Sequence, residues 1–146
     1  MRNPFSFKDK TVMKLKKYFT NREDIIMAFL FGSWVKGGNG IESDMDIAVY
    51  FKPKTGILEW EANTYYDNEN SIWLEIERIV QREVDLLVLN RASATIAESA
   101  LKGIPIIIKD HSFYIDFLLR ITSEAIDFRD WIESYWSLKE KRRYGS

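Results

Sequence analysis

Two stretches decide the fold of this chain: IIMAFLFGS at residues 25–33 and SDMDIAVYF at residues 43–51. Each contains a short apolar run of strand length, the first ending at Gly32 and the second stopped by Pro53. These runs are far shorter than the roughly 20 apolar residues of a membrane span. We therefore expect two buried strands, Ile25–Phe31 and Asp46–Phe51, joined by a glycine-rich loop.

Helical and strand-like segments alternate around this pair. The predicted helices are Phe7–Phe19, Ser71–Arg82, Ala92–Lys102 and Ser112 to about Lys141, and the other predicted strands are Val84–Leu89, ending at Asn90, and Ile104–Ile108. Such alternation is typical of an α/β (α+β) protein, in which helices flank a small mixed β-sheet. The 146 residues suffice for one domain over 1–146, with a core at about 8–110, a long C-terminal helix at about 112–141 and a polar tail at 142–146.

The composition excludes several classes of protein. Lys and Arg total 21 against 22 for Asp and Glu, so we expect no direct nucleic-acid binding, which normally shows as a basic excess. The absence of cysteine excludes a disulfide scaffold, a zinc ribbon and a thiol nucleophile. Residues 1–19 build no apolar signal region, and we expect a cytoplasmic protein with no membrane partner.

Polar residues with a specific chemistry follow the first strand and begin the second. Gly32 and Ser33 are suited to phosphate, because glycine lets an anion approach the backbone and Ser33 is expected to begin a short helical turn. Asp44 and Asp46 are two apart on a strand, so both carboxylates leave the same face. Paired carboxylates of this kind suit Mg²⁺, and Asp85, at the start of an apolar strand, offers a third acid.

Together these motifs resemble the active-site signature of the DNA polymerase β-like nucleotidyltransferases. Gly-Ser at 32–33, Ser-Asp-x-Asp-Ile-Ala-Val at 43–49 and Val-Asp-Leu-Leu-Val-Leu-Asn at 84–90 are similar to the minimal nucleotidyltransferases, which include antitoxins paired with HEPN ribonuclease toxins. The resemblance covers roughly residues 25–108. It implies a polymerase β-like fold, two Mg²⁺ ions, ATP as the donor and transfer of AMP to a hydroxyl.

The resemblance also implies a role for each motif residue. Gly32 and Ser33 would hold the triphosphate, with Lys36 at a basic position of the family's loop. Asp44, Asp46 and Asp85 would bind the metal ions and carry the catalysis. Glu83 lies two residues before Asp85, on the same face of the strand, and remains an alternative ligand.

The sequence leaves three possibilities open for the function, two of which differ in the acceptor of the AMP group. In the antitoxin branch it is a tyrosine of the partner HEPN toxin, which is the reading we favour. A small-molecule hydroxyl, as in aminoglycoside-modifying enzymes, is the second possibility. The third is an antitoxin that masks its toxin without catalysis, although three converging carboxylates argue against an inactive protein.

Aromatic residues gather in two places. Those of the first group are candidates for a wall around adenine or for ordinary packing: Trp60, Tyr65, Tyr66 and Trp73. Those of the second group crowd the last helix: Tyr114, Phe128, Trp131, Tyr135 and Trp136. The second group predicts either core packing or a surface for a protein partner, the acceptor or a second copy of the chain.

Overall fold

The computed structural model describes residues 7–32, 44–54, 58–59 and 63–143, and within these the side chains of all but 7–9, 128–129 and 139–143. In chain order the elements are α1 (Phe7–Thr20), β1 (Ile25–Phe31), β2 (Met45–Phe51), α2 (Glu69–Val80), β3 (Val84–Val88), the 3₁₀ turn η2 (Leu89–Arg91), α3 (Ala94–Leu101), β4 (Ile104–Ile108) and α4 (His111–Arg143). The expected α/β architecture, a small mixed sheet flanked by helices with a long C-terminal helix, is confirmed.

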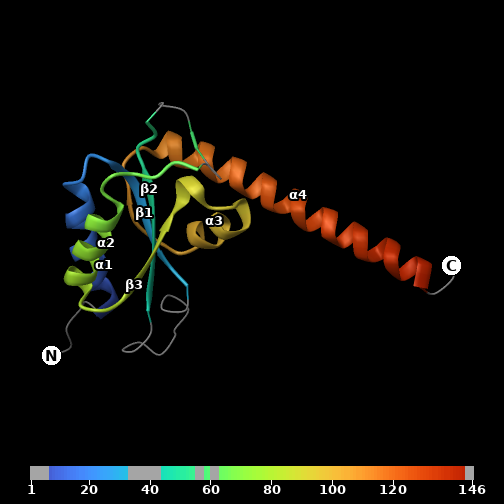
Figure 1. Cartoon of the computed structure of the whole chain (residues 1–146), viewed down its shortest axis with the longest axis horizontal. Coiled ribbons are helices and arrows are strands. Elements are labelled where there is room, and N and C mark those ends of the chain that lie inside the picture. Colours follow the sequence, from blue (N-terminus) through green and yellow to red (C-terminus); the bar gives the residue numbers. More distant parts are fainter. Residues whose placement is uncertain (1–6, 33–43, 55–57, 60–62, 144–146) are drawn as a thin grey trace.

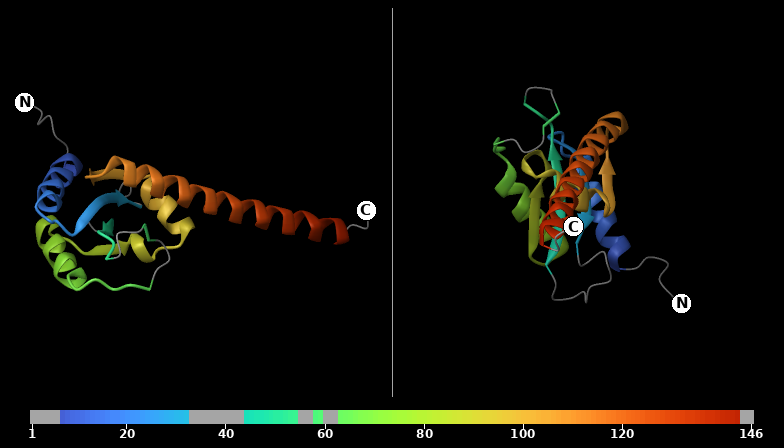
Figure 2. Two further views of the ribbon diagram at one scale, coloured as in Figure 1. Left: turned by 90° about the horizontal axis from the view of Figure 1, so that it is seen from above. Right: turned by 90° about the vertical axis from the view of Figure 1, so that its right-hand side faces the viewer.

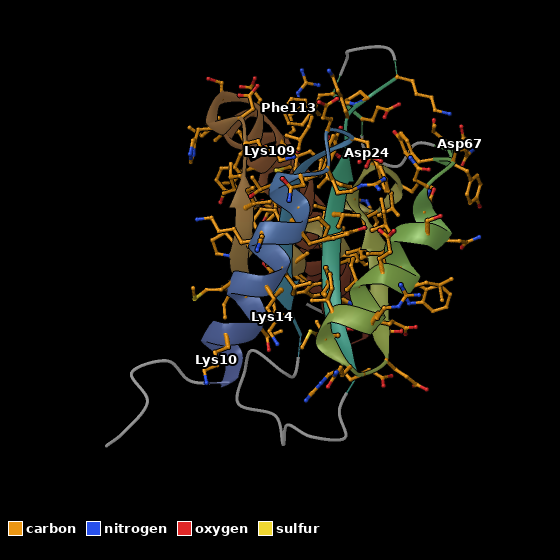
Figure 3. The ribbon with its side chains drawn as sticks, turned by 90° about the vertical axis from the view of Figure 1, so that its left-hand side faces the viewer. Lys10, Lys14, Asp24, Asp67, Lys109 and Phe113 are labelled. Carbon is orange, nitrogen blue, oxygen red and sulfur yellow. The ribbon has the colours of Figure 1, made fainter. Side chains whose placement is uncertain are left out.

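The four strands form one sheet in the order β3-β2-β1-β4. β1 pairs antiparallel with β2 and β4, whereas β2 pairs parallel with β3. Because a parallel pair needs a crossover, α2 connects β2 to β3. Figure 3 shows α1 and α2 side by side over one face of the sheet, and α3 and α4 cover the other face (Figures 1 and 2).

Each face of the sheet has its own apolar core. On the α1/α2 face, Leu15 and Phe19 of α1 and Ile72 of α2 pack on alternate residues of the strands. On the α3/α4 face, small alanines of α3 and Phe117 of α4 pack on the residues between them. β1 lies between both layers, which explains why its sequence is apolar throughout.

β3 is an edge strand, and its outward backbone groups at Val84 are bound by side chains of α2. The Val84 N–H donates to Glu77 Oε2 (2.9 Å), and the Val84 carbonyl accepts from Trp73 Nε1 (2.7 Å). These bonds fix β3 against α2 at the position just before Asp85.

α4 belongs to the body of the protein over only part of its length. Phe117, Ile121 and Ala125 are buried at successive helical turns. Beyond Ala125, none of the described side chains is buried, and the helix projects away from the sheet (Figures 1 and 2). Among the described residues, no helix combines the length and the apolar character that crossing a membrane requires.

All eight predicted segments are present, and their ends differ from the prediction by at most two residues. The strands Ile25–Phe31 and Ile104–Ile108 are as predicted. The third helix begins at Ala94 rather than Ala92, because Ser93 caps it by accepting the Ile96 N–H. The last helix continues to Arg143, so the predicted polar tail is helical at 142–143, and residues 144–146 lie outside the described chain.

Candidate active site

The pairing of β2 with β3 brings two of the predicted acids together. Asp46 and Asp85 are direct partners in the parallel register. Residues in register on neighbouring strands point to the same face, with the strands about 4.8 Å apart. That face is the one covered by α3 and α4, because Asp46 alternates in phase with the buried Ala48 and Tyr50. Asp44 lies just before β2 and is exposed.

The charges of these acids act on one another. Burial raises the pKa of the half-buried Asp46 carboxyl, and the negative charges of Asp85 and Asp44, with a hydrogen bond to Asp85, raise it further. A cation bound between such carboxylates stabilises the site, because their mutual repulsion is then replaced by attraction to the cation.

Residue 32 must be a glycine because the Asp46 side chain occupies the space that a larger residue would need. Its backbone has a φ of +83°, which L side chains rarely adopt, and a Cβ there would stand 2.1 Å from Asp46 Oδ2. The Asp46 carboxylate therefore lies directly against the glycine that ends β1. The sequence predicts that the missing side chain admits a phosphate, and this contact stays a prediction. In the structure the missing side chain also makes room for the Asp46 carboxylate.

Of the two alternatives for the third acid, Asp85 is the one that interacts with Asp46 through its side chain. Asp85 contributes both charge and a hydrogen bond to Asp46. Glu83 precedes β3, its side chain is exposed, and its backbone carbonyl accepts the Met45 N–H at 3.1 Å. Glu83 thus acts on the start of β2 through its main chain, while Asp85 meets Asp46 through its carboxylate.

Two predicted phosphate-binding residues, Ser33 and Lys36, lie outside the described residues. Within the part of the chain that the structure describes, no group of three or more His, Asp or Glu side chains is arranged to hold a metal ion. The described residues do supply the pair Asp46 and Asp85, with oxygen donors of the kind that Mg²⁺ takes. In donor chemistry this pair fits a magnesium ion.

Of the aromatic residues considered as an adenine wall, the three that the structure describes do not form one surface. Tyr66 stacks on Phe51 with ring centroids 4.5 Å apart, as part of the core. Tyr65 is exposed and faces the Arg91 guanidinium, and Trp60 is outside the described residues. Trp73 lies near Asp85, and both line a groove of about 270 Å³.

Sequence reasoning missed the buried polar group at the other end of β2. Asn90, expected only to end a strand, is fully buried, and its Oδ1 accepts the Phe51 N–H at 2.9 Å. Its Nδ2 donates to the Phe51 carbonyl and to the Tyr66 hydroxyl, each at 3.0 Å. The Asn90 side chain thus extends the hydrogen bonding of β2 beyond Val88, where the pairing with β3 ends. The feature of the sequence that could have indicated this role is the position of Asn90, an amide residue directly after a predicted apolar strand.

The comparisons with known proteins identify the family and agree with the fold. The family model described as "Polymerase beta, Nucleotidyltransferase" matches residues 13–112, from α1 to the start of α4. No curated protein matches the chain.

Several solved structures share the fold. A chain from a crystal structure of a mutant MntA–HpeT toxin–antitoxin is 17% identical, with a TM-score of 0.62 over 91% of this chain and 97% of that one. A chain from a toxin–antitoxin with AMP-PNP is 18% identical, with a TM-score of 0.62 over 85% and 95%. A chain from the tri-AMPylated Shewanella oneidensis HEPN toxin in complex with MNT antitoxin is 16% identical, with a TM-score of 0.62 over 90% and 97%. At these identities the likeness establishes the fold.

Proposed function

The chain belongs to the polymerase β nucleotidyltransferase family, and from this premise we propose that it transfers AMP from ATP to a tyrosine of a HEPN-type ribonuclease toxin, in the cytoplasm, and so acts as antitoxin. The observation that carries the proposal is the in-register pair Asp46 and Asp85, in which Asp46 lies against Gly32. Support for the donor and acceptor comes from the neighbouring structures, which include a toxin–antitoxin with AMP-PNP and an AMPylated HEPN toxin.

Asp46 and Asp85 would hold Mg²⁺, with Asp44 joining from the exposed side of the same edge. When bound, one or two such ions supply charge neutralisation on the triphosphate and on the departing pyrophosphate. Ser33 and Lys36 would bind the phosphates from the loop after β1, with the backbone of Gly32 beside them.

The transfer is an in-line displacement at the α-phosphorus. The tyrosine oxygen forms the new bond to phosphorus, the bond to the bridging oxygen of the β-phosphate breaks, and pyrophosphate leaves. Asp85 accepts the proton of the attacking hydroxyl, since its carboxylate is exposed and reachable from solvent. Asp46, half-buried and hydrogen-bonded, has the positioning role.

The test uses ATP labelled in the α-phosphate, Mg²⁺ and the purified product of the gene adjacent to this one. We expect an added AMP on a tyrosine of that protein, located by mass spectrometry. The Asp46→Asn variant should lose the transfer. Asp67→Asn is the matched control, because Asp67 is also an acid but lies at the opposite end of the sheet (Figure 3), and it should transfer normally.

Three other results would reject the proposal in different ways. Labelling of a small hydroxylated compound, with no labelled protein, would indicate a small-molecule acceptor. Tight binding of the neighbouring protein without any transfer would indicate an antitoxin that only masks its toxin. Undiminished transfer by Asp46→Asn would remove the acid pair from the active site.

A further inference from the structure

A groove of about 270 Å³ lies between α2 and the outer edge of β3, the edge strand of the sheet, and we call it the β3 groove. The residues that line it include members of both elements: Asn70 and Trp73 of α2, and Val84, Asp85, Leu86 and Val88 of β3. Because Asp85 both lines this groove and interacts with Asp46, the groove is continuous with the candidate active site.

The outward backbone groups of β3 differ between Val84 and Leu86. At Val84, Glu77 accepts from the N–H and Trp73 donates to the carbonyl. Alternate residues of a strand direct these groups to the same edge, so the N–H and carbonyl of Leu86 also point outward, beside the groove. Among the described residues, none forms a hydrogen bond with either outward group of Leu86. An open backbone edge of this kind favours a ligand with a complementary series of N–H and carbonyl groups, and an extended peptide is such a ligand.

The two faces of the sheet determine where the side chains of such a peptide would point. Residues in register on neighbouring strands, about 4.8 Å apart, point to the same face. A peptide residue opposite Asp85 therefore points to the face of Asp85 and Asp46. The next residue of the peptide points to the α2 face, where Leu86 packs against the apolar core and Trp73 lines the groove. A tyrosine opposite Asp85 with an apolar residue beside it fits both surfaces.

A nucleotide fits the β3 groove less well than a peptide does. The acids that would bind its metal ions point to the face covered by α3 and α4. The apolar residues of the groove, Val84, Leu86 and Val88, point to the other face. A nucleotide bound at the acids would therefore have to bend around the edge of β3 to place its base in the groove. A peptide strand lies along that edge and reaches both faces, because its side chains alternate.

We propose that the acceptor protein binds through an extended segment that adds to the outer edge of β3, with the acceptor tyrosine opposite Asp85 and a neighbouring apolar side chain in the β3 groove. The inference rests on the proposed function, since it takes the acceptor to be a protein tyrosine. Backbone bonding at Leu86 positions the segment, and the alternation of its side chains brings the hydroxyl to the acids. We therefore expect the modified tyrosine in a part of the acceptor that is extended when bound.

The first test measures amide hydrogen exchange in this chain, residue by residue by NMR, with and without the purified product of the adjacent gene. The Leu86 N–H should exchange at least about tenfold more slowly in the complex, because a hydrogen bond to the added strand protects it. The Val84 N–H is the internal control, since Glu77 already binds it and its exchange should change less than about twofold. Equal slowing of both amides would indicate a general stabilisation on binding and would overturn the added strand.

The second test fills the groove and measures transfer. Asn70 is exposed on α2 and lines the groove, so Asn70→Trp should occupy the space of the peptide side chain and raise KM for the acceptor at least about tenfold. Ser71→Trp is the matched control, because it places the same ring at the next exposed position of α2, which is not among the residues that line the groove. It should change KM less than about twofold. Both variants should keep kcat and the KM for ATP, since neither replaces a residue of the active site.

The outcomes separate the added strand from the proposed function. Slower exchange at Leu86 without any transfer by the wild type keeps the strand and rejects the function. Unchanged exchange at Leu86, or transfer that is insensitive to Asn70→Trp, overturns the strand and leaves the function standing when the wild type transfers AMP. Two further results overturn the strand as well. One is a raised KM for ATP in Asn70→Trp, which would assign the groove to the nucleotide base, and the other is a dimer of this chain in sedimentation that Asn70→Trp abolishes.

Discussion

The contact between Gly32 and Asp46 makes Gly32→Ala a decisive perturbation. An alanine Cβ would lie 2.1 Å from Asp46 Oδ2, whereas ordinary contact begins at 3.4 Å, so the two atoms must separate by a further 1.3 Å. The substitution also places an L-residue at a φ of +83°, which costs about 1–2 kcal/mol. The first effect acts on the site, and the second acts on stability.

The expected result is a large loss of activity with a small loss of stability. Displacing a reacting or positioning group by about 1 Å can lower a rate by roughly 100-fold, and we expect that magnitude for kcat. The backbone cost should lower the melting temperature by roughly 2–8 °C for a domain of this size.

The assay is AMP transfer at a temperature where circular dichroism shows the variant folded. Ile76→Val is the matched control, because it removes one buried methyl group from α2, on the other face of the sheet, and costs about 0.5–1.5 kcal/mol. It should lose comparable stability and keep its activity. A Gly32→Ala protein that transfers AMP at the wild-type rate would refute the seating of Asp46 against Gly32.

Three other predictions follow from the described contacts. Asp85→Asn should abolish transfer and Glu83→Gln should retain most of it in the same assay, and the reverse would make Glu83 the third acid. Asn90→Ala should destabilise the fold by about 2–4 kcal/mol in urea unfolding, because it leaves two buried backbone groups unpaired; a change below about 0.5 kcal/mol would contradict this. Burial would raise the pKa of the Glu69 carboxyl, but hydrogen bonds from Arg91 and a backbone N–H hold it below its usual value. The stability that the Glu69–Arg91 pair contributes is therefore fully present when the pH is above the usual pKa of a Glu carboxyl, and it is lost as the pH falls through the lower pKa of the folded protein. Arg91→Gln should remove this contribution and so flatten a plot of melting temperature against pH below about pH 5. An unchanged plot would show that the pair adds no stability.

The local parts of this fold are predictable because they depend on short-range patterns. β1 and β4 are runs of apolar residues bounded by Gly32 and Gly103, and their limits follow from sequence alone. The spacing of Asp44 and Asp46, two residues apart in the sequence, is equally local. Their chemistry could therefore be proposed before the strand order was known.

The long-range parts are not contained in such patterns. That Asp85 pairs with Asp46 depends on β3 lying parallel to β2 in one particular register, which many sequences with the same alternation would not adopt. The amide of Asn90 bonds to Phe51, 39 positions away, and no periodicity reports a bond across that distance.

The last helix illustrates a third case. Its apolar residues repeat at helical spacing both before and after Ala125, so the pattern alone leaves core packing and exposure open. The structure decides between core packing and exposure, because Ala125 is the last buried residue among the described side chains of α4. Tyr114 packs on Phe29 with ring centroids 5.9 Å apart, whereas Trp131 and Trp136 are exposed. Phe128 lies outside the described side chains.

The anchoring of β3 to α2 has a consequence for solubility. An edge strand rich in Val and Leu is a template onto which another chain can add and begin an aggregate. At Val84 both outward backbone groups are already bound, by Glu77 and Trp73, so an incoming strand would have to break two hydrogen bonds before it could pair there. Asp85, the next residue, adds a charge that is costly to stack against its own kind. The acid proposed for catalysis thus also protects the strand that carries it from self-association.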